Sequence, residues 1–128
     1  MRDKMNSLWN PEDAILAANK ALEGLGSFSL HGETAYLELA RGGSLAYELL
    51  PCEKLTRVTL GQTLNRARNR RSPLVACPYV DVKAAGQFRD AGVPFIDSAG
   101  NVFLAVKKLL VRHTGQRPLA RRKRDTSP

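Results

Sequence analysis

The chain has 128 residues, enough for one domain with its own hydrophobic core, and 43% of them are hydrophobic. No apolar run approaches the ~20 residues of a membrane helix, and no apolar stretch follows the first residues. We therefore expect no signal peptide, no membrane partner and a cytoplasmic location. Residues 1–56 hold 5 Lys/Arg against 8 Asp/Glu, whereas residues 57–128 hold 15 against 4. Such a basic half attracts polyanions, of which nucleic acid is the commonest in a cell.

The first predicted helix begins at Pro11, after the N-cap candidate Asn10, and ends near Gly24. The apolar residues then change from helical spacing to strict alternation, which predicts three short strands. These strands lie around residues 28–30, 35–39 and 45–49. Pro51, which cannot donate to a sheet, ends the third strand.

A second helix is predicted from the capping pattern of Thr59 with Gln62. A third begins after the N-cap candidate Asp81, with Val82 on its inner face, and ends at Gly92. Further strands are predicted at residues 74–77, 93–97, 102–106 and 109–111.

The resulting order, αβββαβαββ, predicts an α/β fold with a mixed central sheet and flanking helices, because strands joined through helices are parallel. We expect one domain over residues 1–112. Residues 113–128, which lack any apolar period, are expected to form a basic flexible tail or linker. The element order resembles that of restriction-endonuclease-like, PD-(D/E)xK proteins.

Nucleases with that motif need one carboxylate, and then a carboxylate-x-Lys on an adjacent strand, to hold Mg²⁺ and activate water. The candidates in this chain are Glu33 or Glu38 as the first carboxylate and Glu48 as the second. Leu50 stands where the lysine would be, so the motif is incomplete. We expect no catalysis, with a divergent Mg²⁺-dependent nuclease as the alternative.

Arginine groups carry the binding hypothesis, because those beside the second helix cannot all face the core and those in the tail suit phosphate neutralisation. The candidate nucleic-acid-binding residues are Arg57, Arg66, Arg68, Arg70, Arg71, Arg117, Arg121, Arg122, Lys123 and Arg124. Aromatic residues make up only 6% of the chain, which argues against a base-stacking platform for single strands. Duplex DNA is therefore the expected partner.

No pattern of metal ligands is visible, and we expect no cofactor or metal. His31 and His113 lack a partner at ligand spacing. Cys52 and Cys77 are far apart in sequence and form no metal motif. We expect them to be free, mostly buried thiols, with a disulfide between them as the alternative.

The run from Asp97 to Asn101 joins two predicted strands. Asp97 can accept backbone N–H bonds across a turn, Gly100 can adopt positive φ, and Asn101 tolerates left-handed geometry. The run therefore predicts a tight structural turn, and a functional surface is the alternative.

Together with residues 73–77 and the short helix between them, residues 91–104 resemble AbiEi-family proteins, described as transcriptional regulators or antitoxins of type IV toxin–antitoxin systems. The resemblance spans about residues 32–112. It implies a degenerate endonuclease-like domain, DNA-linked regulation and a cognate toxin as partner. Members also carry a winged helix, and no such pattern is visible here; residues 115–124 look like the linker where it would begin.

Three functions follow. The leading one is a non-catalytic nucleic-acid-binding regulatory domain of the antitoxin or transcription-regulator kind. The others are the divergent nuclease and an interaction module that neutralises an acidic protein partner.

Overall fold

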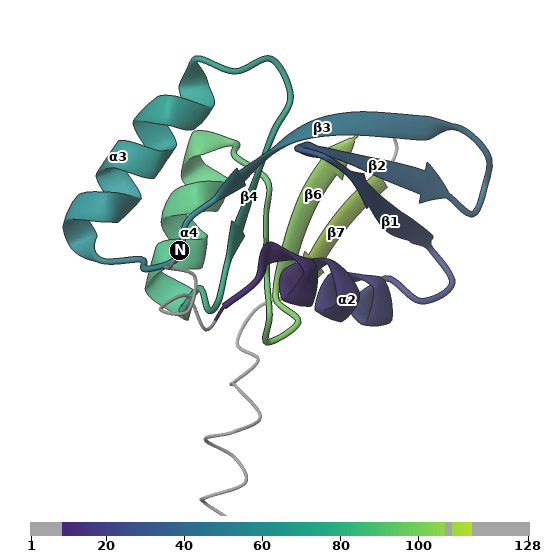
Figure 1. Cartoon of the computed structure of the whole chain (residues 1–128), viewed down its shortest axis with the longest axis horizontal. Coiled ribbons are helices and arrows are strands. Elements are labelled where there is room, and N and C mark those ends of the chain that lie inside the picture. The colour runs from purple at the N-terminus through teal and green to yellow at the C-terminus, as the bar shows by residue number, and fades with distance from the viewer. Residues whose placement is uncertain (1–8, 107–108, 114–128) are drawn as a thin grey trace, which may run out of the picture.

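The computed structural model describes residues 9–106 and 109–113, which form three helices and one curled, mixed seven-stranded sheet (Figure 1). The helices are α2 (Pro11–Ala21), α3 (Arg57–Arg68) and α4 (Val82–Ala91). The strands are β1 (Gly26–His31), β2 (Thr34–Leu39), β3 (Ser44–Pro51), β4 (Pro73–Cys77), β5 (Phe95–Asp97), β6 (Val102–Val106) and β7 (Leu109–His113). The predicted α/β class with a mixed sheet and flanking helices is confirmed.

The strands lie in the sheet in their order along the chain. Strands β1, β2 and β3 form an antiparallel meander. Strand β3 pairs in parallel with β4, and β4 with β5, because α3 and α4 carry the chain back across the sheet after each strand. Strands β5, β6 and β7 are again antiparallel.

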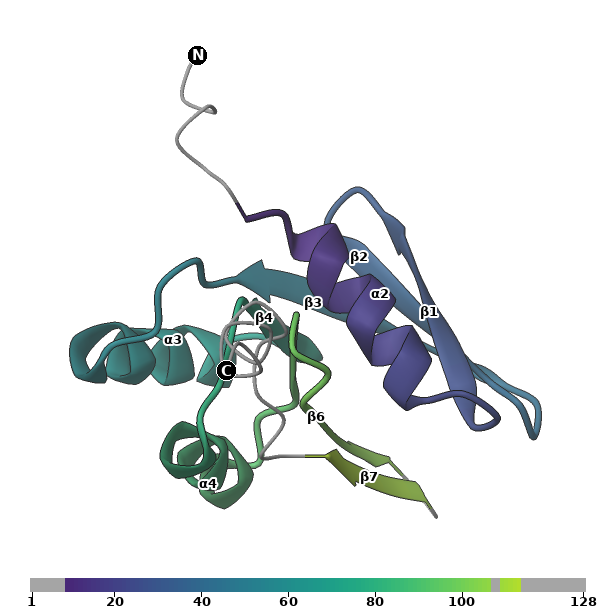
Figure 2. The same cartoon turned by 90° about the horizontal axis from the view of Figure 1, so that it is seen from below.

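The sheet is covered on both faces (Figure 2). Helix α2 packs on one face, where it contacts β1, β4 and β5, while α3 and α4 pack on the other. Strand β4 lies between the two cores, so its alternate side chains enter different ones. Leu74 and Ala76 pack with α2, whereas Val75 and Cys77 pack with α3 and α4.

Helix α2 begins as its sequence predicts. The Asn10 side chain caps it by accepting a hydrogen bond from the Glu12 N–H at 2.9 Å, and Pro11 occupies the first turn. Its buried residues, Ala14, Ile15 and Ala18, recur at helical spacing and face the sheet.

Helix α3 begins earlier than the capping pattern of Thr59 with Gln62 predicts. The cap is Thr56: its side chain accepts the Thr59 N–H at 3.2 Å, and the Thr59 hydroxyl accepts the Thr56 N–H at 2.6 Å. Threonine can serve at both ends of such a box, because its short hydroxyl reaches either backbone amide. The shift places Arg57 at the start of the helix.

Helix α4 has the expected Asp81 cap and Gly92 end, but the predicted inner position of Val82 is wrong. Val82 is 61% exposed, since it lies in the first turn and points away from the face that Ala85 and Phe88 bury. Strand β7 ends at His113, which the sequence places at the start of the tail. The rest of the predicted tail lies outside the described residues. No helix in the described part is both long and apolar enough to cross a membrane.

Candidate nucleic-acid interface and the adjoining cleft

The segment of residues 57–71, here called the arginine segment, covers α3 and the turn that follows it. It holds five arginines and no Asp or Glu. All five are exposed: Arg57, Arg66, Arg68, Arg70 and Arg71. The apolar face of α3 is turned inward through Leu60 and Ala67, which leaves the cations on the solvent side. The segment therefore concentrates positive charge on one helix of the molecule.

The arginines flank the exposed face of α3 rather than forming one stripe. At about 100° per residue, Arg57 and Arg68 lie within about 20° of each other, and about three helical turns apart, whereas Arg66 lies on the other side. Uncharged exposed residues, including Gln62 and Asn65, lie between them. Arginines in this arrangement can contact phosphates on both sides of the helix. They are less suited to contact with one row of phosphates along it.

One arginine of the segment is engaged within the protein. The Arg70 Nη1 lies 2.6 Å from the Glu48 Oε2 on β3, with 42% and 40% of the two side chains exposed. Because both groups remain solvated, the pair contributes less than about 1 kcal/mol to stability. Its effect on charge is larger, since it neutralises Arg70 toward any anionic ligand. Sequence reasoning missed this pair because it joins residues that only the packing of β3 against β4 brings together.

Glu48 also lines a cleft of about 340 Å³ between the start of α2, the β1–β2 turn, β3 and the end of α3. Its charged lining residues are Glu12, Glu33, Glu48, Arg66 and Arg70. The Leu49 N–H donates to the Glu33 carbonyl at 2.8 Å, which fixes the β1–β2 turn beside β3. Of the two alternatives for a first carboxylate, Glu33 thus shares a cleft with Glu48.

Glu38 does not belong to this cleft. It pairs with Ser27 on β1 and Ser44 on β3, toward the opposite end of β2 from Thr34, which is the partner of Glu48. Four positions of β2, about 13 Å at ~3.3 Å per residue, separate Glu38 from Thr34, so Glu38 does not share the cleft with Glu33 and Glu48. Glu12, which was not among the residues predicted for a site, also lines the cleft.

The residue two positions after Glu48 decides what the cleft can do. Leu50 is 3% exposed and packs in the core beneath α3 and α4, so an apolar side chain occupies the position of the motif lysine. Among the described residues, no group of three His, Cys, Asp or Glu side chains is arranged to hold a metal ion. The cleft thus has carboxylates and guanidinium groups but not the cage that metal-assisted hydrolysis uses.

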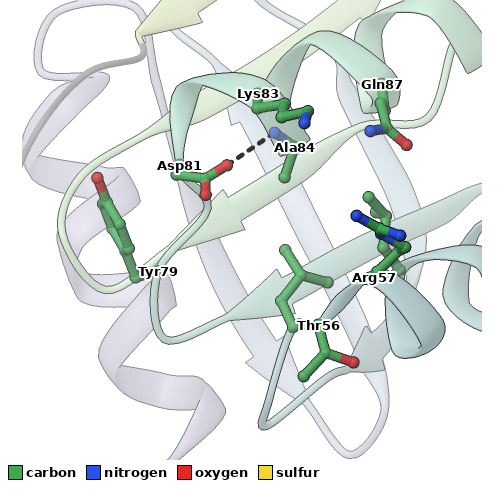
Figure 3. Close-up of a pocket in the computed structure, with 9 residues that line it drawn as sticks. Thr56, Arg57, Tyr79, Asp81, Lys83, Ala84 and Gln87 are labelled. Atoms are coloured by element: carbon green, nitrogen blue, oxygen red, sulfur yellow. Dashed lines mark hydrogen bonds between the residues drawn. The ribbon is translucent and has the colours of Figure 1, made fainter.

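A second hollow, of about 240 Å³, lies between the N-termini of α3 and α4 (Figure 3). Arg57 and Lys83 supply its cationic side chains, and Asp81 its one carboxylate. The Asp81 Oδ1 accepts the Ala84 N–H at 2.8 Å and so serves as the cap of α4. Both helix dipoles present their positive ends here, which adds to the cationic side of the molecule. Lys83 was not among the residues predicted from the sequence, because only the packing of α4 beside α3 brings it near Arg57.

The run from Asp97 to Asn101 forms a buried turn between β5 and β6. Asp97 is 0% exposed, and its Oδ1 accepts the N–H groups of Ala99 at 2.9 Å and Asn101 at 2.8 Å. Its Oδ2 accepts the Val80 N–H and the Asn101 side-chain amide, both at 2.7 Å. Gly100 has φ +97°, a conformation that side chains with a β-carbon rarely adopt.

Burial raises the pKa of Asp97, while its hydrogen bonds act in the opposite direction. Neither Asp97 nor Asn101 reaches the surface, since Asn101 is also 0% exposed. Within this run, the two polar side chains hold the backbone in place and offer no contact surface.

The remaining predicted binding residues, Arg117, Arg121, Arg122, Lys123 and Arg124, lie outside the described residues. Comparison with known proteins finds no family model, no curated protein and no solved structure that matches the chain. The charge and geometry of its own residues therefore carry any argument about function.

Proposed function

We propose that this chain is a non-catalytic DNA-binding regulatory domain, which binds duplex DNA through the arginine segment. The observation that supports this most is the density of charge there: five exposed arginines within residues 57–71, with no acidic residue among them. Exposed cations of this kind bind phosphates, and the affinity does not depend on base sequence.

The salt dependence of this binding can be estimated from the number of arginines in the segment that form no ion pair within the described residues. Of the five arginines, Arg70 is paired with Glu48, and no ion pair is found for the other four within the described part of the chain. Each phosphate contact adds about −0.9 to the slope of log K against log salt, so four contacts give a slope of about −3.6. The tail cations, Arg121 to Arg124, would add to this slope.

We further propose that the domain is a degenerate relative of restriction-endonuclease-like proteins, with the antitoxin or transcription-regulator role that the AbiEi resemblance implies and with a cognate toxin as partner. Two features support this. The elements from α2 to β4 run helix, three strands, helix, strand. Glu33 and Glu48 share a cleft in which Leu50 replaces the motif lysine. A protein that retains the cleft without the lysine would hold DNA without hydrolysing it.

Fluorescence anisotropy of a labelled duplex tests the binding proposal in a salt series. We expect Arg66→Gln combined with Arg68→Gln to weaken binding and to reduce the salt slope by about 1 to 2. The matched control, Lys20→Gln with Arg41→Gln, removes the same charge from exposed positions outside the segment and should change the slope much less. If the parent chain shows no binding at ~50 mM salt, or both pairs weaken it equally, the arginine segment is not the interface.

The one observation that favours a nuclease is the meeting of Glu33 and Glu48 with Arg66 and Arg70 in a single cleft. Incubation of supercoiled plasmid with Mg²⁺ or Mn²⁺ decides between the two functions. We expect no cleavage, because Leu50 supplies no charge where the reaction needs it. Cleavage that disappears in Glu48→Ala would instead establish the nuclease, since a contaminating enzyme would not respond to that change.

A further inference from the structure

The two cysteines of the chain, 25 positions apart in sequence, lie side by side at the carboxyl ends of β3 and β4. In the parallel ladder Pro51 is the partner of Ala76, and the Cys52 N–H donates to the Ala76 carbonyl at 2.8 Å. Cys52 and Cys77 are therefore the next pair along. Both side chains enter the core beneath α3 and α4.

This position suits a disulfide. Neighbouring strands lie ~4.8 Å apart, within the ~4.4–6.8 Å between Cα atoms that a disulfide bridges. Closing the bond also needs the Cβ atoms to approach to ~3.8 Å. Cys52 follows the last residue of β3, whereas Cys77 is the last residue of β4 and pairs with Asp97 on β5, so of the two Cys52 lies outside the strands.

The two thiols differ in access. Cys52 is 8% exposed and lines a hollow with Lys54 and Thr63, whereas Cys77 is 0% exposed. A small molecule that enters the hollow would therefore meet the Cys52 sulfur first.

They also differ in acidity. The pKa of Cys52 is lowered to about 6, mainly because Cys77 donates a hydrogen bond to it, with a further donation from the Thr63 hydroxyl at 3.5 Å. The pKa of Cys77 is raised, because its hydrogen bond to Cys52 and its burial both hold the proton. The more accessible sulfur is thus also the more easily ionised and the better nucleophile.

We propose that Cys52 and Cys77 form a peroxide-oxidised dithiol that closes into an intrachain disulfide between β3 and β4. In the first step the Cys52 thiolate attacks hydrogen peroxide, which gives a sulfenic acid and hydroxide. The Cys77 sulfur then attacks that sulfenic sulfur, and the sulfenic OH leaves as water with the Cys77 proton, while the proton that Cys52 released on ionising neutralises the hydroxide of the first step. In total, two thiols and one peroxide yield one disulfide and two waters.

The bond would join the two ends of the stretch that contains α3, since Cys52 precedes that helix and Cys77 follows it. It would thereby restrain separation of the helix from β3 and β4 during unfolding. The bond depends on the register of β3 and β4 and on the shared core position of the two cysteines, and not on DNA binding.

The test is treatment of the reduced full-length chain with hydrogen peroxide, followed by intact-mass analysis and by alkylation under denaturing conditions. We expect a loss of about 2 Da, no alkylation of either cysteine, and full recovery of both thiols after a dithiol reductant. Non-reducing digestion should give one peptide pair that links Cys52 to Cys77. Unchanged thiols, stable gain of oxygen atoms, or a disulfide between two chains would each overturn the proposal.

Single variants test the assigned roles. In Cys77→Ala, Cys52 should still react with peroxide and be trapped as a sulfenic acid by dimedone, whereas in Cys52→Ala the buried Cys77 should not. Alkylation of Cys52 should also lose its midpoint near pH 6 in Cys77→Ala and require higher pH, because the main donor to the thiolate is gone. Trapping at Cys77 but not at Cys52, or an unchanged pH profile, would show that Cys52 is not the attacking thiol. The parent chain carries the main result even where a variant folds poorly.

Discussion

Two carboxylates of this molecule, Glu48 and Asp97, lie in opposite environments. Glu48 is half-exposed at the rim of a cleft and is held by one ion pair to Arg70. Asp97 is fully buried and accepts four N–H groups from its own turn and from Val80. Asp97, which belongs to the more conspicuous sequence motif, therefore stabilises a buried turn. Glu48, an ordinary strand residue, lies where a ligand could reach it. Changes to either should separate stability from binding.

The largest effect is expected for Asp97→Ala. The substitution leaves four N–H groups without their acceptor, in a turn whose acceptor side chain is completely buried. Each unsatisfied buried donor costs about 1–3 kcal/mol, so the free energy of unfolding should fall by more than about 3 kcal/mol. Urea denaturation measures this loss. A variant that unfolds like the parent but no longer binds DNA would show that the turn is a contact surface, and the structural role assigned to Asp97 would be wrong.

Gly100→Val should destabilise by less, but by more than about 1 kcal/mol, because a β-branched residue is strained at φ +97°. An added β-carbon would meet nothing within 4 Å, so the backbone conformation alone is responsible. Gly61→Ala is the matched control: it also meets open space but lies in α3, where alanine should stabilise by roughly 1 kcal/mol. If thermal melts show that both variants have melting temperatures above that of the parent, or both below it, backbone strain at Gly100 is not the cause.

The pH dependence of stability should reflect Asp97. Because burial raises its pKa, the folded chain holds the Asp97 proton more tightly than the unfolded chain does. This contribution is complete below the ordinary pKa of ~3.9 and is lost as the pH rises through the higher folded value. Urea titrations of the parent and of Asp97→Asn, which cannot ionise there, should show the parent losing stability relative to the variant in that window. If the parent instead gains stability relative to Asp97→Asn as the pH rises, the hydrogen bonds to the Asp97 carboxylate outweigh the effect of its burial.

The smallest change in stability, less than about 1 kcal/mol, is expected for Glu48→Gln. Its effect on binding should be more informative, since removal of the carboxylate frees Arg70 and takes an anion away from the arginine segment. The duplex should bind more tightly, and the salt slope should become steeper by up to about 0.9. Glu38→Gln changes the same charge outside the cleft and should have less effect. Equal gains in the two variants would indicate a response to net charge alone.

Much of the local structure could be read from particular residues. Asn10 with Pro11, Asp81 and Gly92 mark helix ends through hydrogen bonds to nearby backbone amides or through backbone conformations that each residue favours by itself. The alternation along β1 to β3 likewise predicts strands, because a half-buried sheet repeats every two residues. The sequence misplaces the start of α3 because Thr59 with Gln62 matches the usual capping-box pattern, whereas the actual cap, Thr56, has Thr59 in the place of Glu or Gln.

The candidate site could be predicted only in part. The sequence shows that the arginine segment lacks acidic residues, which is a property of composition. It cannot show that Arg70 lies against Glu48, that Glu33 but not Glu38 shares the cleft, or that Lys83 lies near Arg57. These relations depend on the register of neighbouring strands and on the packing of two helices, neither of which leaves a periodic signal in the chain.

Charge, turns and element order depend on residues close together in sequence, whereas contacts between distant residues depend on how the strands and helices pack. The sequence by itself determined the cationic segment, the geometry of the Asp97 turn and the α/β class, because these follow from nearest-neighbour chemistry and burial periodicity. Only the tertiary structure decided that Cys52 and Cys77 meet and that Glu48 is paired. A parallel strand pair needs a crossover between its members, so which side chains become neighbours is settled when the sheet assembles.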